Sequence, residues 1–125
     1  FKGFAKTRQA IDDLSKAAAT ATKNLSNRLN DSRLSLSSIE IEFLNRQLIA
    51  LEKSFIDQKG MYYGDWFKSI YASSDPFSGY ASWILPGIEY ELAIKRTKKL
   101  KEWDNRYAEA IANLAQKMSE MSANY

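Results

Sequence analysis

Three stretches of this sequence repeat apolar residues at alternating spacings of three and four. The first covers residues 6–29, with apolar positions Ile11, Leu14, Ala18, Ala21 and Leu25. The second ends near Phe55 and contains Ile41, Leu44, Leu48 and Leu51. The third covers residues 98–122, with Leu100, Trp103, Tyr107, Ile111, Leu114, Met118 and Met121. This spacing aligns each set along one side of an α-helix. It predicts an all-α fold, a helical bundle of about four helices with antiparallel packing.

Local signals place the helix ends. Ser37 followed three residues later by Glu40 is a capping box that begins the second long helix. Pro86 and Gly87 precede a short helix predicted over residues 88–97, because proline is favourable near a helix start. The sequence leaves open whether the chain breaks near Thr97 or continues as one helix. The absence of valine and the presence of only 5 Gly and 2 Pro also favour a few long helices over strands.

Residues 57–86 form a long aromatic-rich loop between the second and third helices. Four of the five glycines and both prolines lie between Asp57 and Gly87. The loop's aromatic residues are Tyr62, Tyr63, Trp66, Phe67, Tyr71, Phe77, Tyr80 and Trp83. Structureless connections of this length are uncommon in compact domains, so the loop is either functional or packed by its own side chains. Residues 66–71 are expected to be a short helix or an extended piece.

Composition excludes most catalytic chemistry. The chain has no histidine and no cysteine, which removes histidine-dependent triads, thiol nucleophiles and nearly every zinc pattern. The close carboxylate pairs are Asp12 with Asp13, Glu40 with Glu42, and Glu89 with Glu91. Residues one or two apart do not share a helix face, so we expect these groups on solvated surfaces. The prediction is a non-enzyme with no cofactor, no metal site and no apolar run long enough for membrane insertion.

The net charge of +3 includes one basic run, formed by Lys95, Arg96, Lys98, Lys99 and Lys101. Acidic neighbours weaken its field, and no aromatic residue is interleaved for base stacking, so no nucleic-acid partner is expected. A solvated face or a docking surface is the preferred interpretation. The alternative function is a free-standing basic helical adaptor that binds phosphates or an anionic membrane.

Two glycosylation sequons are present, beginning at Asn24 and Asn30. Asn30 lies in the polar connection expected over residues 30–38, so it is the better acceptor. Either sequon matters only in an extracellular or luminal chain.

Several motifs resemble one known family. They are NRQLIALEKSFID at 45–57, SIYA at 69–72, GYA at 79–81 and LPGI at 85–88. These segments are similar to the transferrin receptor-like dimerisation domain, the C-terminal helical domain of glutamate carboxypeptidase II-like proteins. The outer helices fit in pattern only.

The resemblance implies a single helical domain over residues 1–125, cut from a larger protein; a chain that opens at Phe1 also suggests a fragment. In the family, the parent is membrane-anchored and carries a zinc-peptidase-like domain on the extracellular or luminal side, vacuolar lumen included. This domain drives homodimerisation, and it contacts the peptidase-like domain of its own chain. If the parent protein is active, its zinc would be bound outside this chain, because the family's zinc ligands lie upstream of this domain.

The resemblance also assigns one pocket residue. In glutamate-specific members, a Lys-Tyr pair of the loop contacts the substrate's glutamate side. Tyr80 matches the tyrosine, whereas Gly79 stands at the lysine position and cannot hold a carboxylate. For the self-association surface, apolar positions of the first and last helices are predicted: Leu14, Ala18, Ala21, Leu114 and Met118.

Overall fold

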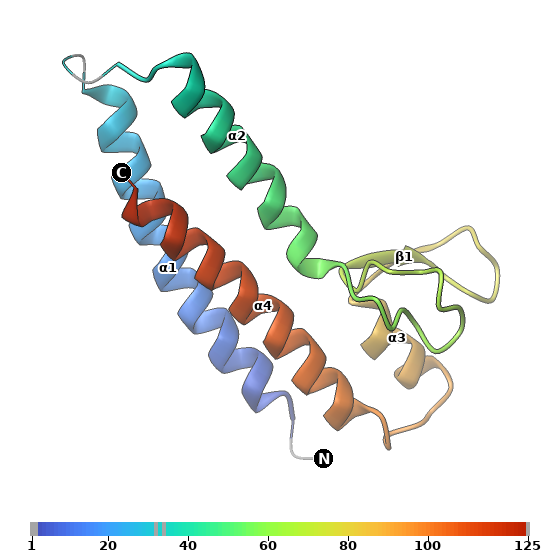
Figure 1. Ribbon diagram of the computed structural model, residues 1–125. Helices are drawn as coiled ribbons and strands as arrows, with labels where there is room; N and C mark the ends of the chain where they lie inside the picture. The colour runs from blue at the N-terminus through green and yellow to red at the C-terminus, as the bar shows by residue number, and fades with distance from the viewer. Residues whose placement is uncertain (1–2, 32, 34, 125) are drawn as a thin grey trace.

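The computed structural model describes residues 3–31, 33 and 35–124. Its long helices are α1 (Ala5–Asn30), α2 (Ser38–Glu52) and α4 (Leu100–Ala123). A 3-10 turn, η1 (Lys53–Phe55), extends α2, and a shorter helix, α3 (Pro86–Ala93), precedes α4. The two strands, β1 (Ala72–Ser74) and β2 (Ser82–Ile84), form a small antiparallel hairpin. The predicted all-α bundle of about four helices with a long loop is confirmed (Figure 1).

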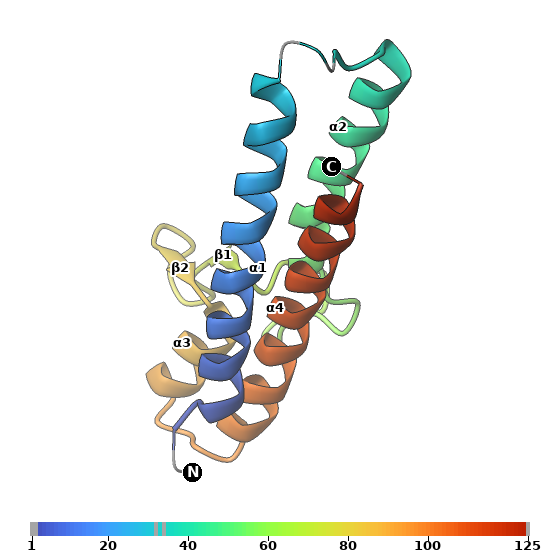
Figure 2. The same ribbon diagram turned by 90° about the vertical axis from the view of Figure 1, so that its left-hand side faces the viewer.

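The two longest helices, α1 and α4, lie side by side and run parallel (Figure 2). Hydrogen bonds tie them at both ends: Thr7 Oγ1 donates to Asp104 Oδ1 over 2.8 Å, and Asn24 Nδ2 donates to Ser122 Oγ over 2.7 Å. The predicted antiparallel packing is therefore wrong for this pair. The reason is the connection, because residues 53–99 carry the chain back to the end where α1 begins. The helix α2 runs in the opposite direction to both of them (Figure 1).

The first turn of α1 receives its cap from α4. Phe4 occupies the N-cap position and gives no side-chain cap. Instead, Asp104 Oδ1 accepts the Thr7 backbone N–H over 2.9 Å, and the carboxylate sits where the helix dipole favours negative charge. Asp104 is 6% exposed. This long-range cap fixes the register of α1 against α4.

The predicted capping box of α2 is confirmed. Ser37 Oγ accepts the Glu40 N–H over 3.2 Å, and Glu40 Oε2 accepts the Ser37 N–H over 2.7 Å. Despite this well-formed start, α2 contacts α4 far less than α1 does. Leu44 is the only buried residue of α2, and it packs with Ala21 and Met121 in a small upper core.

The loop and the first half of α4 form a larger, lower core. Its buried members are Met61, Ile70, Trp103, Tyr107 and Ala110. Gly87 lies directly on the Trp103 ring, where a Cβ atom would come within 2.3 Å of ring carbons. The loop is therefore packed by its own side chains, one of the two alternatives for it. Within residues 66–71 no helix forms, and Ser69 instead pairs with Ile56 in an isolated bridge.

The chain breaks between α3 and α4, which resolves the question left open at Thr97. Arg96 N–H donates to Glu91 O over 2.9 Å, and Lys95 N–H donates to Leu92 O over 3.1 Å. These two bonds form a Schellman motif, which ends the helix with a residue in the left-handed conformation. Lys95 occupies that position with φ 54°, where glycine would be unstrained.

Candidate functional site

The aromatic end of the molecule presents one predicted site residue on a rigid turn. The Asp75 side chain accepts backbone N–H groups of Phe77, Ser78 and Ala81 and the Ser78 hydroxyl. These hydrogen bonds, led by that from Ser78, lower the pKa of Asp75 to about 2. Gly79 completes the turn with φ 75°. The turn is thus locked while its outer side chains remain free to contact another surface.

Tyr80 lies at the tip of this turn and is 96% exposed. Almost all of its side chain is therefore open to contact from another surface. A Cβ at Gly79 would meet nothing within 4 Å, so the space beside Tyr80 is open. Other large apolar side chains are exposed at the same end: Trp66, Phe77 and Ile84. Such a group of exposed apolar residues is typical of an interaction surface.

The basic run lies at the corner between α3 and α4, and the fold uses two of its five cations. Arg96 holds Glu91 in a two-point ion pair, with bonds of 2.6 and 2.7 Å. Lys99 lies 3.4 Å from Glu102, and its ammonium stands 4.9 Å from the centre of the Tyr62 ring. Lys95, Lys98 and Lys101 are exposed. The positive field at this corner is therefore weaker than the sequence suggests.

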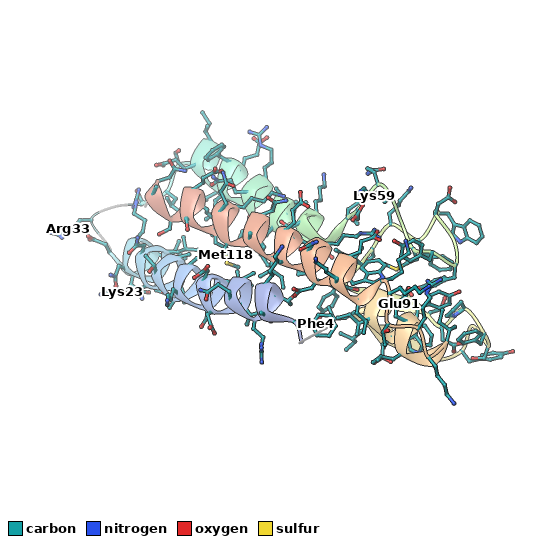
Figure 3. The ribbon with its side chains drawn as sticks, turned by 90° about the horizontal axis from the view of Figure 1, so that it is seen from below. Phe4, Lys23, Arg33, Lys59, Glu91 and Met118 are labelled. Carbon is teal, nitrogen blue, oxygen red and sulfur yellow. The ribbon has the colours of Figure 1, made fainter. Side chains whose placement is uncertain are left out.

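Glu91 corrects a prediction. We expected the close carboxylate pairs on solvated surfaces, but Glu91 is 0% exposed (labelled in Figure 3). Burial of a carboxylate requires a partner, and Arg96 supplies it five residues later. The same hydrogen bonds raise the pKa of Arg96, so its guanidinium stays protonated. Its role is structural, because it closes the end of α3.

A second ion pair was missed by the sequence analysis. Arg106 Nε donates to Asp57 Oδ2 over 2.9 Å, and Arg106 Nη2 donates to Gly60 O over 2.8 Å. Its guanidinium also stacks 4.0 Å from the Trp103 ring centre. The two partners lie 49 residues apart, so no local signal could have paired them. The pair fastens the start of the loop to α4.

The predicted dimer-interface residues occupy different environments. Ala21 is 5% exposed and belongs to the upper core, and its place in a self-association surface stays a prediction. Leu14, Ala18, Leu114 and Met118 are half-buried. Met118 packs against the upper core and is drawn between α1 and α4 in Figure 3. Contact of these four residues with a second copy stays a prediction.

The two sequons also differ. Asn24 is half-buried in the body of α1, and its amide nitrogen, the atom that would carry a glycan, bonds to Ser122. Asn30 is the exposed last residue of α1. The third residue of its sequon, Ser32, lies outside the described residues. Asn30 is therefore the more accessible of the two asparagines, and glycosylation of either stays a prediction.

The described part of the chain contains no constellation for metal chemistry. Over residues 3–31, 33 and 35–124, no group of three or more acidic, histidine or cysteine side chains could hold a metal ion. Within the same residues, no helix combines the length and apolar character needed to cross a membrane. What the geometry offers is surface for contact with other proteins.

The largest group of functional candidates that sequence reasoning missed is on α2. Ile39, Ile41, Phe43, Leu48 and Ile49 are all exposed, between 42% and 78%. The three-four spacing had suggested that Ile41 and Leu48 face the chain's own core. The sequence did contain a signal that α2 has more apolar residues than one buried face can hold. Three apolar residues lie outside the three-four spacing and make the helix apolar on most sides: Ile39, Phe43 and Ile49.

Comparison with known proteins gives one match. A family model described as the transferrin receptor-like dimerisation domain matches residues 2–119. Neither the curated proteins nor the solved structures contain a match to this chain. The family match covers α1, α2, the aromatic loop, the α3–α4 corner and α4 as far as residue 119.

Proposed function

Because this chain belongs to the transferrin receptor-like dimerisation domain family, we propose that it is the C-terminal helical domain of a membrane-anchored, zinc-peptidase-like protein. The family supports a non-catalytic role in homodimerisation. The absence of histidine and cysteine agrees with that role, because the parent's chemistry would have to reside in another domain.

The proposal for the aromatic end rests on one observation: Tyr80 is almost fully exposed, yet its turn is fixed by four hydrogen bonds to Asp75. An ordered loop with an exposed tyrosine suits a side chain that completes a pocket on a neighbouring domain. In the parent, Tyr80 would border the substrate pocket of the peptidase-like domain. Gly79 supplies no cation there, so a preference for a substrate other than glutamate is expected.

The proposed location is the extracellular or luminal side of the parent's membrane, with zinc bound by residues outside this chain. The exposed Asn30 sequon is compatible with that location. The basic adaptor gains no support from the structure, since Arg96 and Lys99 already have internal partners.

The first experiment isolates the native polypeptide with an antibody against this chain and measures its length and zinc content. The expected result is a polypeptide several times longer than 125 residues. Bound zinc would identify an active peptidase, and the same length without zinc would indicate an inactive, receptor-like relative. A native polypeptide of 125 residues would contradict the proposal.

If the parent hydrolyses peptides, Tyr80→Ala tests the pocket. We expect KM to rise while the dimer is retained. Trp66→Ala is the matched control, because it also removes an exposed aromatic ring at the same end, where Trp66 is 72% exposed. Equal kinetics for Tyr80→Ala and the unaltered protein would remove Tyr80 from the substrate site.

A further inference from the structure

The apolar stripe of α2 is only partly used by its own chain. Leu44 is 7% exposed, and Leu51 and Phe55 are half-buried. Ile41 and Leu48, seven residues apart on the same stripe, remain 46% and 42% exposed. A seven-residue apolar repeat is the seam by which helices pair. The helix α4 thus covers one half of this seam, and the other half, formed by Ile41 and Leu48, remains open to solvent.

The amount of exposed surface fits a missing partner. The chain exposes 8323 Å², whereas a compact monomer of its mass would expose about 6,800 Å². The difference, about 1,500 Å², exceeds the roughly 800 Å² that each partner buries in a standard interface. The shape of the monomer therefore leaves room for one such contact.

An apolar recess extends the open seam. A cavity of about 310 Å³ lies between the end of α2, β1 and α4, lined by Leu51, Glu52, Phe55, Tyr71 and Leu114. Leu114 was among the residues predicted for self-association, and it lies on this recess rather than on a separate face. Glu52 is the single charged residue that lines it.

The other faces are less suited to a dimer. The groove between α1 and α4 is lined mainly by small or polar residues, among them Ala17, Thr20, Ala108, Ala112 and Ser119, which offer little area to bury. Ile39 and Phe43 lie on the opposite flank of α2, because residues two apart on a helix point about 200° apart. The open seam combines large apolar side chains with a recess.

Charges on α2 are compatible with an identical partner. Glu42 and Arg46 pair with each other over 3.6 Å, so two copies of this face would meet without uncompensated like charge from that pair. A two-fold axis requires a self-complementary surface. An antiparallel crossing of two α2 helices centred near Asn45 would place Ile41 of each copy against Leu48 of the other.

We propose that α2 forms the two-fold contact of the homodimer, with Ile41 and Leu48 of one copy packing against Leu48 and Ile41 of a second copy. This inference rests on the proposed homodimer and specifies its surface. The contact completes the half-open seam and covers the recess at Leu114.

The test is sedimentation velocity on the complete polypeptide that contains this chain, carrying Leu48→Asp. A charge buried at the proposed dimer contact should weaken the dimer at least about tenfold in Kd. Ile39→Asp is the matched control, because it adds the same charge to the same helix at a residue that is 78% exposed. Its dimer should be unchanged. Circular dichroism checks that both variants fold.

A cross-linking variant gives a second readout that needs no loss of function. Asn45→Cys near the proposed axis should form a disulfide with its own copy under mild oxidation, whereas Ile39→Cys should not. The chain itself contains no other cysteine. If the unaltered polypeptide sediments as a monomer, the proposed homodimer itself is contradicted. A dimer that tolerates Leu48→Asp and fails to cross-link through Asn45→Cys would overturn the α2 contact alone, and would leave α2 to another domain of the parent.

Discussion

The two ends of this bundle bury their apolar residues very differently. At the lower end, Trp103 and Tyr107 are 1% and 0% exposed, enclosed by the aromatic loop and α3. At the upper end, Leu44 is the one buried residue of α2, and five other large apolar residues of the helix remain exposed. The lower end therefore has a well-buried core beneath an exposed aromatic turn, whereas the upper end has a smaller core and leaves most of the apolar surface of α2 exposed.

The difference shows how one short chain can combine folding and assembly. The loop supplies aromatic side chains that fill the space around α4 and hold Tyr80 on a fixed turn. The α2 helix has a strong start at its capping box but weak lateral support. The lower core, where the chain packs on itself, provides most of the stability, whereas α2 presents exposed apolar surface. This is the pattern expected of a dimerisation domain.

The largest effect should come from Trp103→Ala. This substitution removes a fully buried ring that contacts Tyr62, Tyr107 and the Arg106 guanidinium. We expect a loss of about 3–5 kcal/mol in the free energy of unfolding. Urea denaturation followed by circular dichroism measures it. A loss below about 1 kcal/mol would mean that the lower core does not carry the fold.

A smaller loss is expected for Leu44→Ala, the equivalent truncation at the upper end. The cost should be about 2 kcal/mol, at the low end for such changes, because a loosely packed helix can move to close the cavity. The same denaturation experiment measures it. If Leu44→Ala costs as much as Trp103→Ala, the two ends are equally well supported and the contrast between them is wrong.

Lys95→Gly should act in the opposite direction. Lys95 holds φ 54° at the end of α3, a conformation that costs a side chain roughly 1 kcal/mol. Glycine should therefore stabilise the fold by up to about 1 kcal/mol, reduced by its greater freedom when unfolded. Thermal denaturation of the variant measures the change. Lys98→Gly, outside the Schellman motif, is the control and should give no gain.

The smallest effect is local and depends on pH. The pKa of Asp75 falls from 3.8 to about 2 on folding, so its carboxylate stabilises the folded turn above pH 4. That contribution is lost as pH falls from about 4 toward 2. Asp75→Asn should flatten this part of the curve of Tm against pH. A variant whose curve parallels that of the unaltered protein would show that the turn does not depend on this charge.

The sequence predicted the elements well because their signals are local. Apolar spacing located the three long helices, and Ser37 with Glu40 marked the start of α2. The parallel packing of α1 and α4 could not be predicted from the sequence, because it depends on where the long loop ends in space and α4 begins. Arg106 with Asp57 and Thr7 with Asp104 are likewise products of the tertiary fold.

The candidate surfaces were predicted less well, for a related reason. Periodicity shows which residues share a helix face, but it does not show whether other elements of the chain pack against that face. Ile41 and Leu48 share the stripe of Leu44, yet only Leu44 is buried. Ala21, which periodicity offered for self-association, lies in the upper core of the single chain. Tyr80 was singled out through the family resemblance, and its exposure emerges only from the turn around Asp75.

The most direct test of the account is hydrogen exchange at high and low protein concentration, followed by mass spectrometry on the complete polypeptide. If α2 is the surface completed by a second copy, peptides from residues 38–55 should gain protection as the dimer forms. Peptides around Trp103 should be equally protected at both concentrations. Protection of α2 that ignores concentration, while peptides of α1 and α4 gain it, would contradict the central claim.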